Sequence, residues 1–304
     1  MTNISILLID DEKAQVENLS RAICKKYQTG ISVFTAHEEK DILSKIEFCH
    51  YDIAIVDLRM SEYSINGFDI VKKINEISPF SKVIIVSAYS AEYKTELNEL
   101  LTIGNILGFI DKEDFKTFSD NIFSLIDSAW KIIDGNNDAS IASLKEYYSS
   151  LKNLDDPYKK GMRFEYFIAM LFNQMGFNKI INRIKDRSSC EVDLAIRNDI
   201  LDPFFSKFKQ YILVECKNYP ENGVERNVFT VFKDKVKNSN GLSDLGILIT
   251  TGYIKSTAYL EALRSSSDNI KIIFLSNPEI ETLIFSSNKL ETFKGIIDQQ
   301  IKDN

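Results

Sequence analysis

The sequence predicts an α/β protein made of two domains. Its 304 residues, of which 44% are hydrophobic and 27% charged, have the length and composition of about two soluble globular domains. In residues 1–133, apolar runs of strand length alternate five times with amphipathic helical patterns. In the rest of the chain, helical spacing and strand-like alternation of apolar residues both recur. Helix and strand patterns in both parts indicate the α/β class.

The first half is predicted to form a doubly wound, five-stranded parallel sheet. The strand-like runs cover residues 4–9, 31–35, 52–56, 82–87 and 106–110, and helical patterns of about 10 to 20 residues separate them. Nearly continuous apolar strands of this kind are covered by helices on both faces. Ligands of such sheets bind beyond the carboxyl ends of the strands, so polar residues there are the first candidates for a site.

A cluster of turn residues separates the two halves. Residues 134–140 read Asp-Gly-Asn-Asn-Asp-Ala-Ser, a composition typical of a boundary between patterned regions. After it, apolar residues recur at helical spacing to about Asn153. We therefore predict one domain over residues 1–133 and a second over residues 157–304, joined by a linker and connecting helix over residues 134–156.

The second half begins with a helical pattern and continues with alternating segments. The helix starts near Lys159, and its apolar stripe ends at Gly176. Glu165 lies at the edge of that stripe. Residues 191–196 and 211–217 then alternate between apolar and polar side chains, as strands with one buried face do.

Charge and cysteine content exclude several classes of function. Residues 1–133 hold 14 Lys and Arg against 21 Asp and Glu, and residues 134–304 hold 23 of each, so the net charge of −7 belongs to the first half. The second half can therefore carry a basic patch. Four single cysteines and two histidines argue against disulfides, structural zinc and chemistry based on histidine.

No segment of the sequence predicts a membrane protein. The longest apolar runs are far shorter than the roughly 18 residues that a membrane span needs. The first residues lack the basic, apolar and small-residue regions of a signal peptide. We expect a cytoplasmic protein with no membrane partner.

Polar residues follow four of the five predicted strands of the first half. Asp10 and Asp11 follow the first strand, Asp57 the third, Ser87 ends the fourth and Lys112 comes just after the fifth. Parallel strands bring their carboxyl ends to one edge, so these side chains converge. Three carboxylates at one site call for a cation, and an all-oxygen set suits Mg²⁺ together with a phosphate. A lysine and a hydroxyl beside it can hold a phosphoryl oxygen.

On these residues, the first half resembles the receiver domain of response regulators, the CheY-like phospho-acceptor module with a flavodoxin-like sheet. The resemblance implies that Asp57 is phosphorylated by a sensor histidine kinase and that Asp10 and Asp11 bind Mg²⁺ with it. It further implies that Lys112 binds the phosphate and that Ser87 and Phe109 are switch residues.

The first half also departs from the receiver pattern. Ser61 stands where a proline is usual, two extra residues precede Gly67, and Glu113 replaces another proline. A receiver that has kept the fold and lost phosphorylation therefore stays open as an alternative.

The two alternating segments of the second half bring acids and a lysine together. In residues 211–217, Glu215 and Lys217 project from the same face of the strand. Charges at the end of an apolar strand are costly unless they are paired or used. With Asp193 on a neighbouring strand, two carboxylates can hold Mg²⁺ while the lysine faces an attacking water. Such a site can hydrolyse a phosphodiester.

These residues resemble the PD-(D/E)xK motif of Mrr-like, restriction-endonuclease-type proteins. The resemblance extends over residues 157–285 and includes the segments around Lys160, Cys190, Leu213 and Leu245. It implies an α/β fold with a mixed sheet, metal binding by Asp193 and Glu215, a catalytic Lys217 and a supporting acid at Glu165. The proline of the motif is absent, since Val192 precedes Asp193.

Basic residues of the second half are candidates for phosphate contacts. Four crowd the approach to Asp193, and three more alternate after the strand of Glu215. They are Lys179, Arg183, Lys185, Arg187, Lys233, Lys235 and Lys237. Contacts of this kind make binding dependent on salt rather than on base sequence. A solvated lysine-rich face is the alternative explanation.

Together, the two halves predict a magnesium-dependent DNA endonuclease controlled by phosphorylation. Mg²⁺ is expected in both domains, with Mn²⁺ as a substitute in the nuclease site, and RNA stays open as a substrate. By resemblance, receivers pair through a face near residues 91–101 and 116–130, so we expect a homodimer. One alternative is a signalling adaptor that keeps the nuclease fold and only binds nucleic acid or a partner protein. Another is a nuclease whose receiver is a passive dimerisation module.

Overall fold

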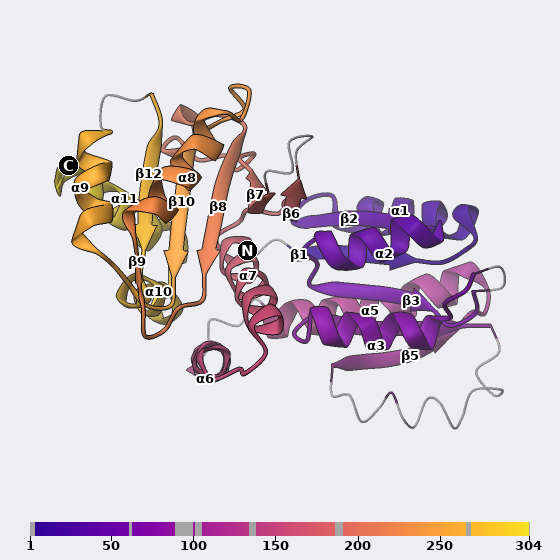
Figure 1. Cartoon of the computed structure of the whole chain (residues 1–304). Coiled ribbons are helices and arrows are strands. Elements are labelled where there is room, and N and C mark those ends of the chain that lie inside the picture. Colours follow the sequence, from indigo (N-terminus) through magenta and orange to yellow (C-terminus); the bar gives the residue numbers. More distant parts are fainter. Residues whose placement is uncertain are drawn as a thin grey trace. The chain divides into compact units, whose positions relative to one another are not determined.

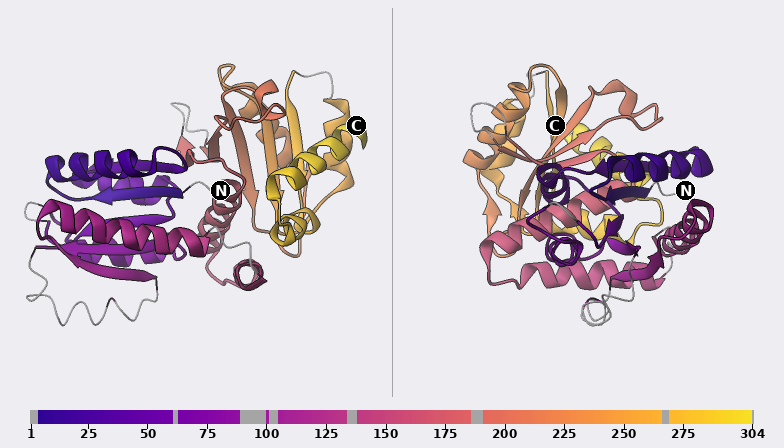
Figure 2. Two further views of the ribbon diagram at one scale, coloured as in Figure 1. Left: turned by 180° about the vertical axis from the view of Figure 1, so that it is seen from behind. Right: turned by 90° about the vertical axis from the view of Figure 1, so that its right-hand side faces the viewer.

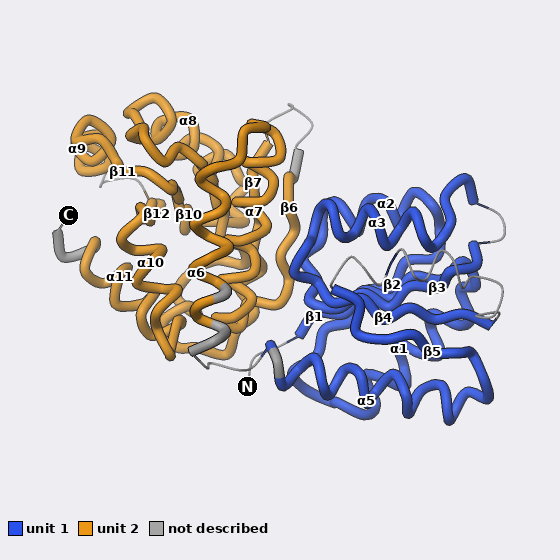
Figure 3. Tube along the Cα trace, turned by 90° about the horizontal axis from the view of Figure 1, so that it is seen from below, with its two compact units in different colours: residues 1–135 blue, residues 136–304 orange. Residues whose placement is uncertain are grey.

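The protein is described from a computed structural model that covers two compact units, residues 1–135 and residues 136–304 (Figure 3). Within them the described residues are 4–60, 63–88, 100, 105–133, 138–185, 191–265 and 269–303. Among these residues, no helix is both long enough and apolar enough to cross a membrane.

The first unit contains a five-stranded sheet in the order β2-β1-β3-β4-β5, and every pairing is parallel (Figure 1). Its strands are β1 (Ile4–Ile9), β2 (Ile31–Ala36), β3 (Ile53–Asp57), β4 (Lys82–Ser87) and β5 (Ile106–Asp111). Its described helices are α1 (Lys13–Tyr27), α2 (Glu39–Phe48), α3 (Gly67–Ile77) and α5 (Phe115–Ile133). The predicted five-stranded parallel sheet is confirmed.

Two apolar cores, one on each face, hold the helices of the first unit to its sheet. Residues of α1 and α5, such as Ile23 and Ile126, pack on one face. Residues of α2 and α3, such as Ile46 and Ile70, pack on the other. The chain reverses its direction of travel across the sheet at β1, because β2 lies on one side of it and β3 on the other. The carboxyl ends of β1 and β3 are therefore adjacent at the point where such sheets bind ligands.

The start of α3 is packed tightly against the end of β3. Asn66 and Asp69 form a capping box, which satisfies free N–H groups at the helix start. A Cβ atom on Gly67 would lie 2.2 Å from the carbonyl oxygen of Asp57 and 2.4 Å from Cα of Leu58. Only glycine fits there, so this residue sets how closely α3 approaches Asp57. Ser61, the departure noted before it, lies outside the described residues.

The second unit contains a mixed five-stranded sheet in the order β12-β10-β8-β7-β6 (Figure 1), and Figure 2 shows it from two further sides. Its strands are β6 (Ile180–Lys185), β7 (Glu191–Arg197), β8 (Tyr211–Lys217), β10 (Ser243–Thr250) and β12 (Lys271–Leu275). The pairs of β8, β10 and β12 are parallel, and those of β6, β7 and β8 are antiparallel. The predicted mixed sheet is confirmed. Two short strands, β9 (Gly223–Val224) and β11 (Tyr253–Ile254), pair separately.

Helices also cover both faces of the second sheet. They are α6 (Asp138–Lys152), α7 (Pro157–Gln174), α8 (Arg226–Lys237), α9 (Ser256–Arg264), α10 (Asn277–Phe285) and α11 (Lys289–Asp303), with a short 3-10 helix, η2, at Phe205–Lys207. The core of one face draws on α6, α7, α10 and α11. The core of the other face draws on α8 and α9.

The connecting helix predicted from the sequence is α6, and it is part of the second unit. Tyr148 stacks on Phe167 of α7 with ring centroids 5.3 Å apart, and its hydroxyl group is 2.9 Å from Oδ1 of Asn277. Leu151 of α6 is fully buried. Because the apolar side of α6 completes the core beneath the sheet, this helix is not a free spacer.

Candidate functional sites

The acids predicted at the strand ends of the first unit come together. Carboxylate oxygens of Asp10, Asp11 and Asp57 all lie within 4.8 Å of one another. Lys112 Nζ lies 2.7 Å from Asp10 Oδ2 and 2.8 Å from Asp57 Oδ2. Lys112 also donates to Oε1 of Gln15 at 2.7 Å. Gln15 lies on α1, and no sequence motif pointed to it.

Burial makes the charge of this acid cluster costly. Burial raises the pKa of Asp10 to about 6, Lys112 opposes the rise, and Asp57 adds to it. The pKa of Asp57 is also raised, first by burial, with Lys112 acting in the opposite direction. Burial alone would lower the pKa of Lys112, but the two carboxylates outweigh burial and raise it. Three carboxylates with one ammonium group fit a hard divalent cation such as Mg²⁺.

The two predicted switch residues lie on neighbouring strands. Ser87 ends β4 and is fully buried, and its carbonyl oxygen accepts a hydrogen bond from the Lys112 N–H at 2.8 Å. Phe109 of β5 is partly buried against the core that α2 and α3 share with the sheet. The segment 89–99, which follows Ser87 and belongs to the predicted pairing face, lies outside the described residues.

In the second unit, neighbouring strands bring the predicted nuclease residues together. Asp193 of β7 accepts a hydrogen bond from the Cys216 N–H of β8 at 2.7 Å, which places its carboxylate beside Glu215 and Lys217. Lys217 Nζ lies 2.8 Å from Glu215 Oε1. Glu215 is only 6% exposed. The second oxygen of Glu215 accepts a hydrogen bond from Lys235 Nζ at 2.8 Å.

Burial and neighbouring charges raise the pKa of two acids of this site, Asp193 and Glu165. Burial raises the pKa of Asp193 to about 6, and the charge of Glu215 adds to the rise. Burial raises the pKa of Glu165 to about 7, with a contribution from Asp193. Burial by itself would lower the pKa of Lys217, but Glu215 and Asp193 outweigh burial and raise it. A bound cation would relieve this repulsion, so the donor set fits a divalent metal.

Arg183 is the partner of Glu165. Its Nε lies 2.9 Å from Glu165 Oε2, and Nη1 donates to the Tyr158 hydroxyl group at 2.8 Å. The backbone of Arg183 has a φ of 52°, a left-handed conformation that is costly for a residue other than glycine. The regular pairing of β6 with β7 also skips this residue. The irregular backbone thus directs Arg183 toward the site.

The predicted basic residues in the described part of the second unit make different contacts. Arg183 and Lys235 point into the nuclease site, whereas Lys179 pairs with Asp199 at 3.3 Å. Lys233 donates to Ser265 Oγ at 3.0 Å, and Lys237 is exposed in the last turn of α8. Of the other two, Lys185 ends β6 and its side chain is not described, and Arg187 lies outside the described residues.

The three lysines that alternate in the sequence after β8 belong to a helix. The segment is helix α8, and two residues along a helix turn about 200° around its axis. Lys235 therefore lies beside the buried Phe232 and Val236, away from Lys233 and Lys237. The sequence did not indicate that one of these lysines would contact Glu215.

The residues that follow β10 pack against the residues that follow β8, next to the site. The Asn218 side chain donates to the carbonyl oxygens of Leu151 and Lys160, both at 3.1 Å, and accepts from Thr251 Oγ1 at 2.9 Å. A Cβ atom on Gly252 would lie 2.2 Å from the carbonyl oxygen of Tyr219. These contacts join α6, α7, β8 and β10 behind Lys217.

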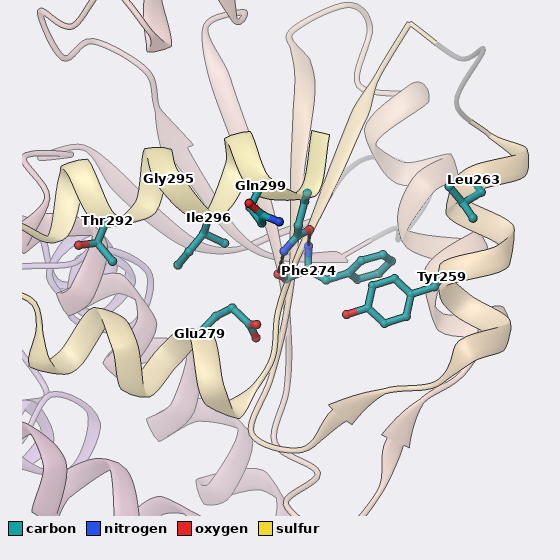
Figure 4. A pocket seen from close by; sticks show the side chains of 9 residues that line it. Tyr259, Leu263, Phe274, Glu279, Thr292, Gly295, Ile296 and Gln299 are labelled. Carbon is teal, nitrogen blue, oxygen red and sulfur yellow. Dashed lines mark hydrogen bonds between the residues drawn. The ribbon is translucent and has the colours of Figure 1, made fainter. Parts of the chain in front are cut away.

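A separate pocket of about 610 Å³ lies where the edge strand β12 meets α9, α10 and α11 (Figure 4). It is lined by Tyr259, Leu263, Phe274, Glu279, Thr292, Gly295, Ile296, Gln299 and Gln300. The Gln300 side chain accepts from the Phe274 N–H at 2.9 Å and donates to the Phe274 carbonyl oxygen at 2.6 Å. Gln300 thus covers the open edge of β12 at this residue. The predicted nuclease residues are not among the pocket residues.

The folds and the two acid clusters define a two-part protein that combines a signalling fold with a nuclease fold. Residues 6–117 match the family model of the response regulator receiver domain, and residues 159–284 match that of a restriction endonuclease. The chain therefore combines a receiver domain with a restriction endonuclease domain of the Mrr type.

Curated relatives match only part of the chain. Autoinducer 1 sensor kinase/phosphatase LuxN of Vibrio campbellii (strain ATCC BAA-1116) is 26% identical over 104 residues, which are 34% of this chain and 11% of LuxN. Transcriptional regulatory protein ComA of Bacillus subtilis (strain 168) is 24% identical over 87 residues, which are 29% of this chain and 40% of ComA. The matches thus span less than half the length of either relative.

Solved structures of receiver proteins also match. A CheY-like receiver domain protein from Methanospirillum hungatei JF-1 is 21% identical, with 42% of this chain and 98% of the other covered and a TM-score of 0.36. Response regulator protein TrrA from Thermotoga maritima is 24% identical, with 40% and 98% covered and a TM-score of 0.33.

Proposed function

We propose that the chain is a divalent-cation-dependent endonuclease that hydrolyses DNA, and that phosphorylation of Asp57 controls it. The observation that carries the nuclease proposal is the contact between Glu215 and Lys217, with Asp193 held beside them by the backbone of β8. This arrangement lies within the segment that matches a restriction endonuclease. It brings together two acids that can hold a metal ion and a lysine that can stabilise charge on a phosphate, a set that supports metal-assisted hydrolysis of a phosphodiester.

In the nuclease site, Asp193 and Glu215 would hold Mg²⁺, with Mn²⁺ as a substitute. The bound cation supplies Lewis-acid stabilisation of the phosphoryl oxygen and lowers the pKa of a water molecule. Lys217 orients that water and stabilises the negative charge that develops on the phosphate. Glu165 supports the site through its charge next to Asp193, and Arg183 holds the Glu165 side chain in place.

In the receiver site, Asp57 would accept a phosphoryl group from the phosphohistidine of a sensor kinase. A carboxylate oxygen of Asp57 forms the new bond to phosphorus as the bond to histidine breaks. Asp10 and Asp11, together with Asp57, would hold the Mg²⁺ ion that offsets the charge of this transfer. Lys112 would then bind a phosphoryl oxygen, and Ser87 and Phe109 would respond to it as switch residues.

We further propose that residues 1–133 form the regulatory domain and that α6 belongs to the nuclease domain, which shortens the linker to residues before Asp138. Phosphorylation would act by pairing two receivers through the face near residues 91–101 and 116–130. Paired chains would bring together two nuclease sites and cut both DNA strands. Sedimentation with and without beryllofluoride tests the pairing, because an unchanged mass would exclude it.

The first experiment is cleavage of supercoiled plasmid by the full chain with Mg²⁺ or Mn²⁺, with and without beryllofluoride. We expect nicked or linear products, their loss in Lys217→Ala and their retention in Lys209→Ala, a lysine on the loop before β8. A beryllofluoride effect that disappears in Asp57→Asn would connect the two domains. Absence of cleavage of plasmid, RNA and modified DNA would refute the nuclease proposal and favour the adaptor.

A further inference from the structure

Lys235 contacts the nuclease site of the second unit, although it is not part of the nuclease motif. It comes from helix α8, outside the strands that carry Asp193, Glu215 and Lys217. Its side chain is 13% exposed, although lysine side chains are rarely buried unless they are paired. Its ammonium group lies 2.8 Å from Glu215 Oε2.

The register of the sheet explains why α8 reaches this acid. Glu215 pairs with Leu248 of β10, and residues paired in neighbouring strands project from the same face. Leu248 belongs to the core between the sheet and α8. Glu215 therefore points toward α8, where Phe232 and Val236 anchor the helix on either side of Lys235.

Each oxygen of the Glu215 carboxylate contacts a different lysine. Lys217 contacts Oε1 and Lys235 contacts Oε2, both at 2.8 Å. The charge of Lys235 also acts on Asp193, the other acid proposed to hold the cation. An ammonium group and a divalent cation at the same carboxylate repel each other and compete for its lone pairs.

We propose that Lys235 is a positioning residue of the nuclease site that neutralises Glu215 in the metal-free chain and competes with the divalent cation for it. This inference rests on the proposed function, in which Asp193 and Glu215 hold the cation. Lys235 holds the buried Glu215 side chain in place without metal, and it lowers the affinity of the site for that metal. The site then fills only at cation concentrations high enough to displace Lys235.

Removal of Lys235 should raise the cation affinity of the site if Lys235 competes with the cation, and should lower it if the role of Lys235 is purely structural. Removal of a positive charge beside the site should tighten Mn²⁺ binding by about tenfold. If Lys235 only supported the position of Glu215, its removal would weaken Mn²⁺ binding instead. Lys235→Arg keeps the charge and should change the affinity little.

The test is calorimetric titration of the full chain with Mn²⁺ in the absence of DNA. Asp11→Asn and Asp57→Asn are present in every sample, so that the acid cluster of the receiver does not contribute. Lys235→Gln removes the charge, and Lys235→Met repeats the measurement if the glutamine variant does not fold. Lys233→Gln is the matched control, since Lys233 lies on the same helix and contacts Ser265.

Tighter Mn²⁺ binding in Lys235→Gln or Lys235→Met, with Lys233→Gln unchanged, is the expected result. Unchanged or weaker binding in the variant that folds would overturn the role of Lys235. Asp193→Asn separates this outcome from failure of the proposed function, because it should abolish the Mn²⁺ signal. A signal that persists in Asp193→Asn would place the cation elsewhere and refute both the metal site and the role of Lys235.

Discussion

The pKa of Glu165 predicts that the metal-free nuclease domain becomes less stable as the pH rises toward neutrality. Burial and the charge of Asp193 raise this pKa from 4.5 to about 7. The folded state therefore binds its proton more tightly than the unfolded state does. Below pH 4.5 both states are protonated and no stability is lost, and the loss is complete above about pH 7.

The size of the loss follows from the same shift. Each pKa unit corresponds to about 1.4 kcal/mol, so a rise from 4.5 to about 7 lowers the free energy of unfolding by about 3 kcal/mol. Glu165 and Arg183 are each 13% exposed, so solvent screens this effect little. The loss should develop between pH 4.5 and 7.

The measurement is urea unfolding of the full chain and of Glu165→Gln in EDTA at several pH values from 5 to 8, followed by circular dichroism. Glutamine still accepts the hydrogen bond from Arg183, and the Arg183 charge is constant over this range. The difference between the two chains should therefore grow by about 3 kcal/mol in favour of the variant. Contributions of the receiver cancel, since the receiver is identical in both. Parallel pH profiles of the two chains would refute the reasoning.

Three further predictions concern single side chains. Gly67→Ala should lower the stability of the receiver by about 1 to 3 kcal/mol in thermal unfolding, because its Cβ would meet the Asp57 carbonyl oxygen at 2.2 Å. Gly295→Ala is the control: its Cβ would meet nothing within 4 Å, so its melting temperature should equal that of the parent chain. Lys112→Met should reduce acetyl phosphate labelling of Asp57 at least tenfold on phosphate-affinity gels, since the phosphoryl group loses its ammonium partner; labelling at the parental level would contradict this. Asn218→Ala should destabilise the nuclease domain by about 1 to 3 kcal/mol, because two partly buried carbonyl oxygens lose the hydrogen bond from Asn218, and an unchanged melting temperature would show that water replaces it.

Much of the fold could be predicted because its signals are local. Apolar runs such as residues 82–87 are long enough to specify a buried strand, and turn residues mark where helices and strands end. The acids of the receiver could be located for the same reason, since parallel strands bring the residues after them to one edge. The alternation around Glu215 placed Lys217 on the same face before any contact was known.

Side chains that reach the sites from distant elements could not be predicted in this way. Lys235 was predicted as a candidate for phosphate contacts, with a solvated lysine-rich face as the alternative. Its contact with Glu215 could not be predicted, because that contact depends on how α8 packs on the sheet. Gln15 had no motif that linked it to Lys112. Arg183 was noted as a basic residue, but its left-handed backbone and its contact with Glu165 arise from an irregular pairing of β6 with β7.

The sequence by itself determined the α/β class, the order of the two domains and the chemical types of their site residues, because periodicity and short motifs are properties of neighbouring residues. The tertiary structure alone decided which charges meet. It paired Lys235 with Glu215 and Arg183 with Glu165, and it made α6 part of the nuclease core. Such contacts depend on the packing of elements that are far apart in the chain, and no local sequence pattern predicts that packing.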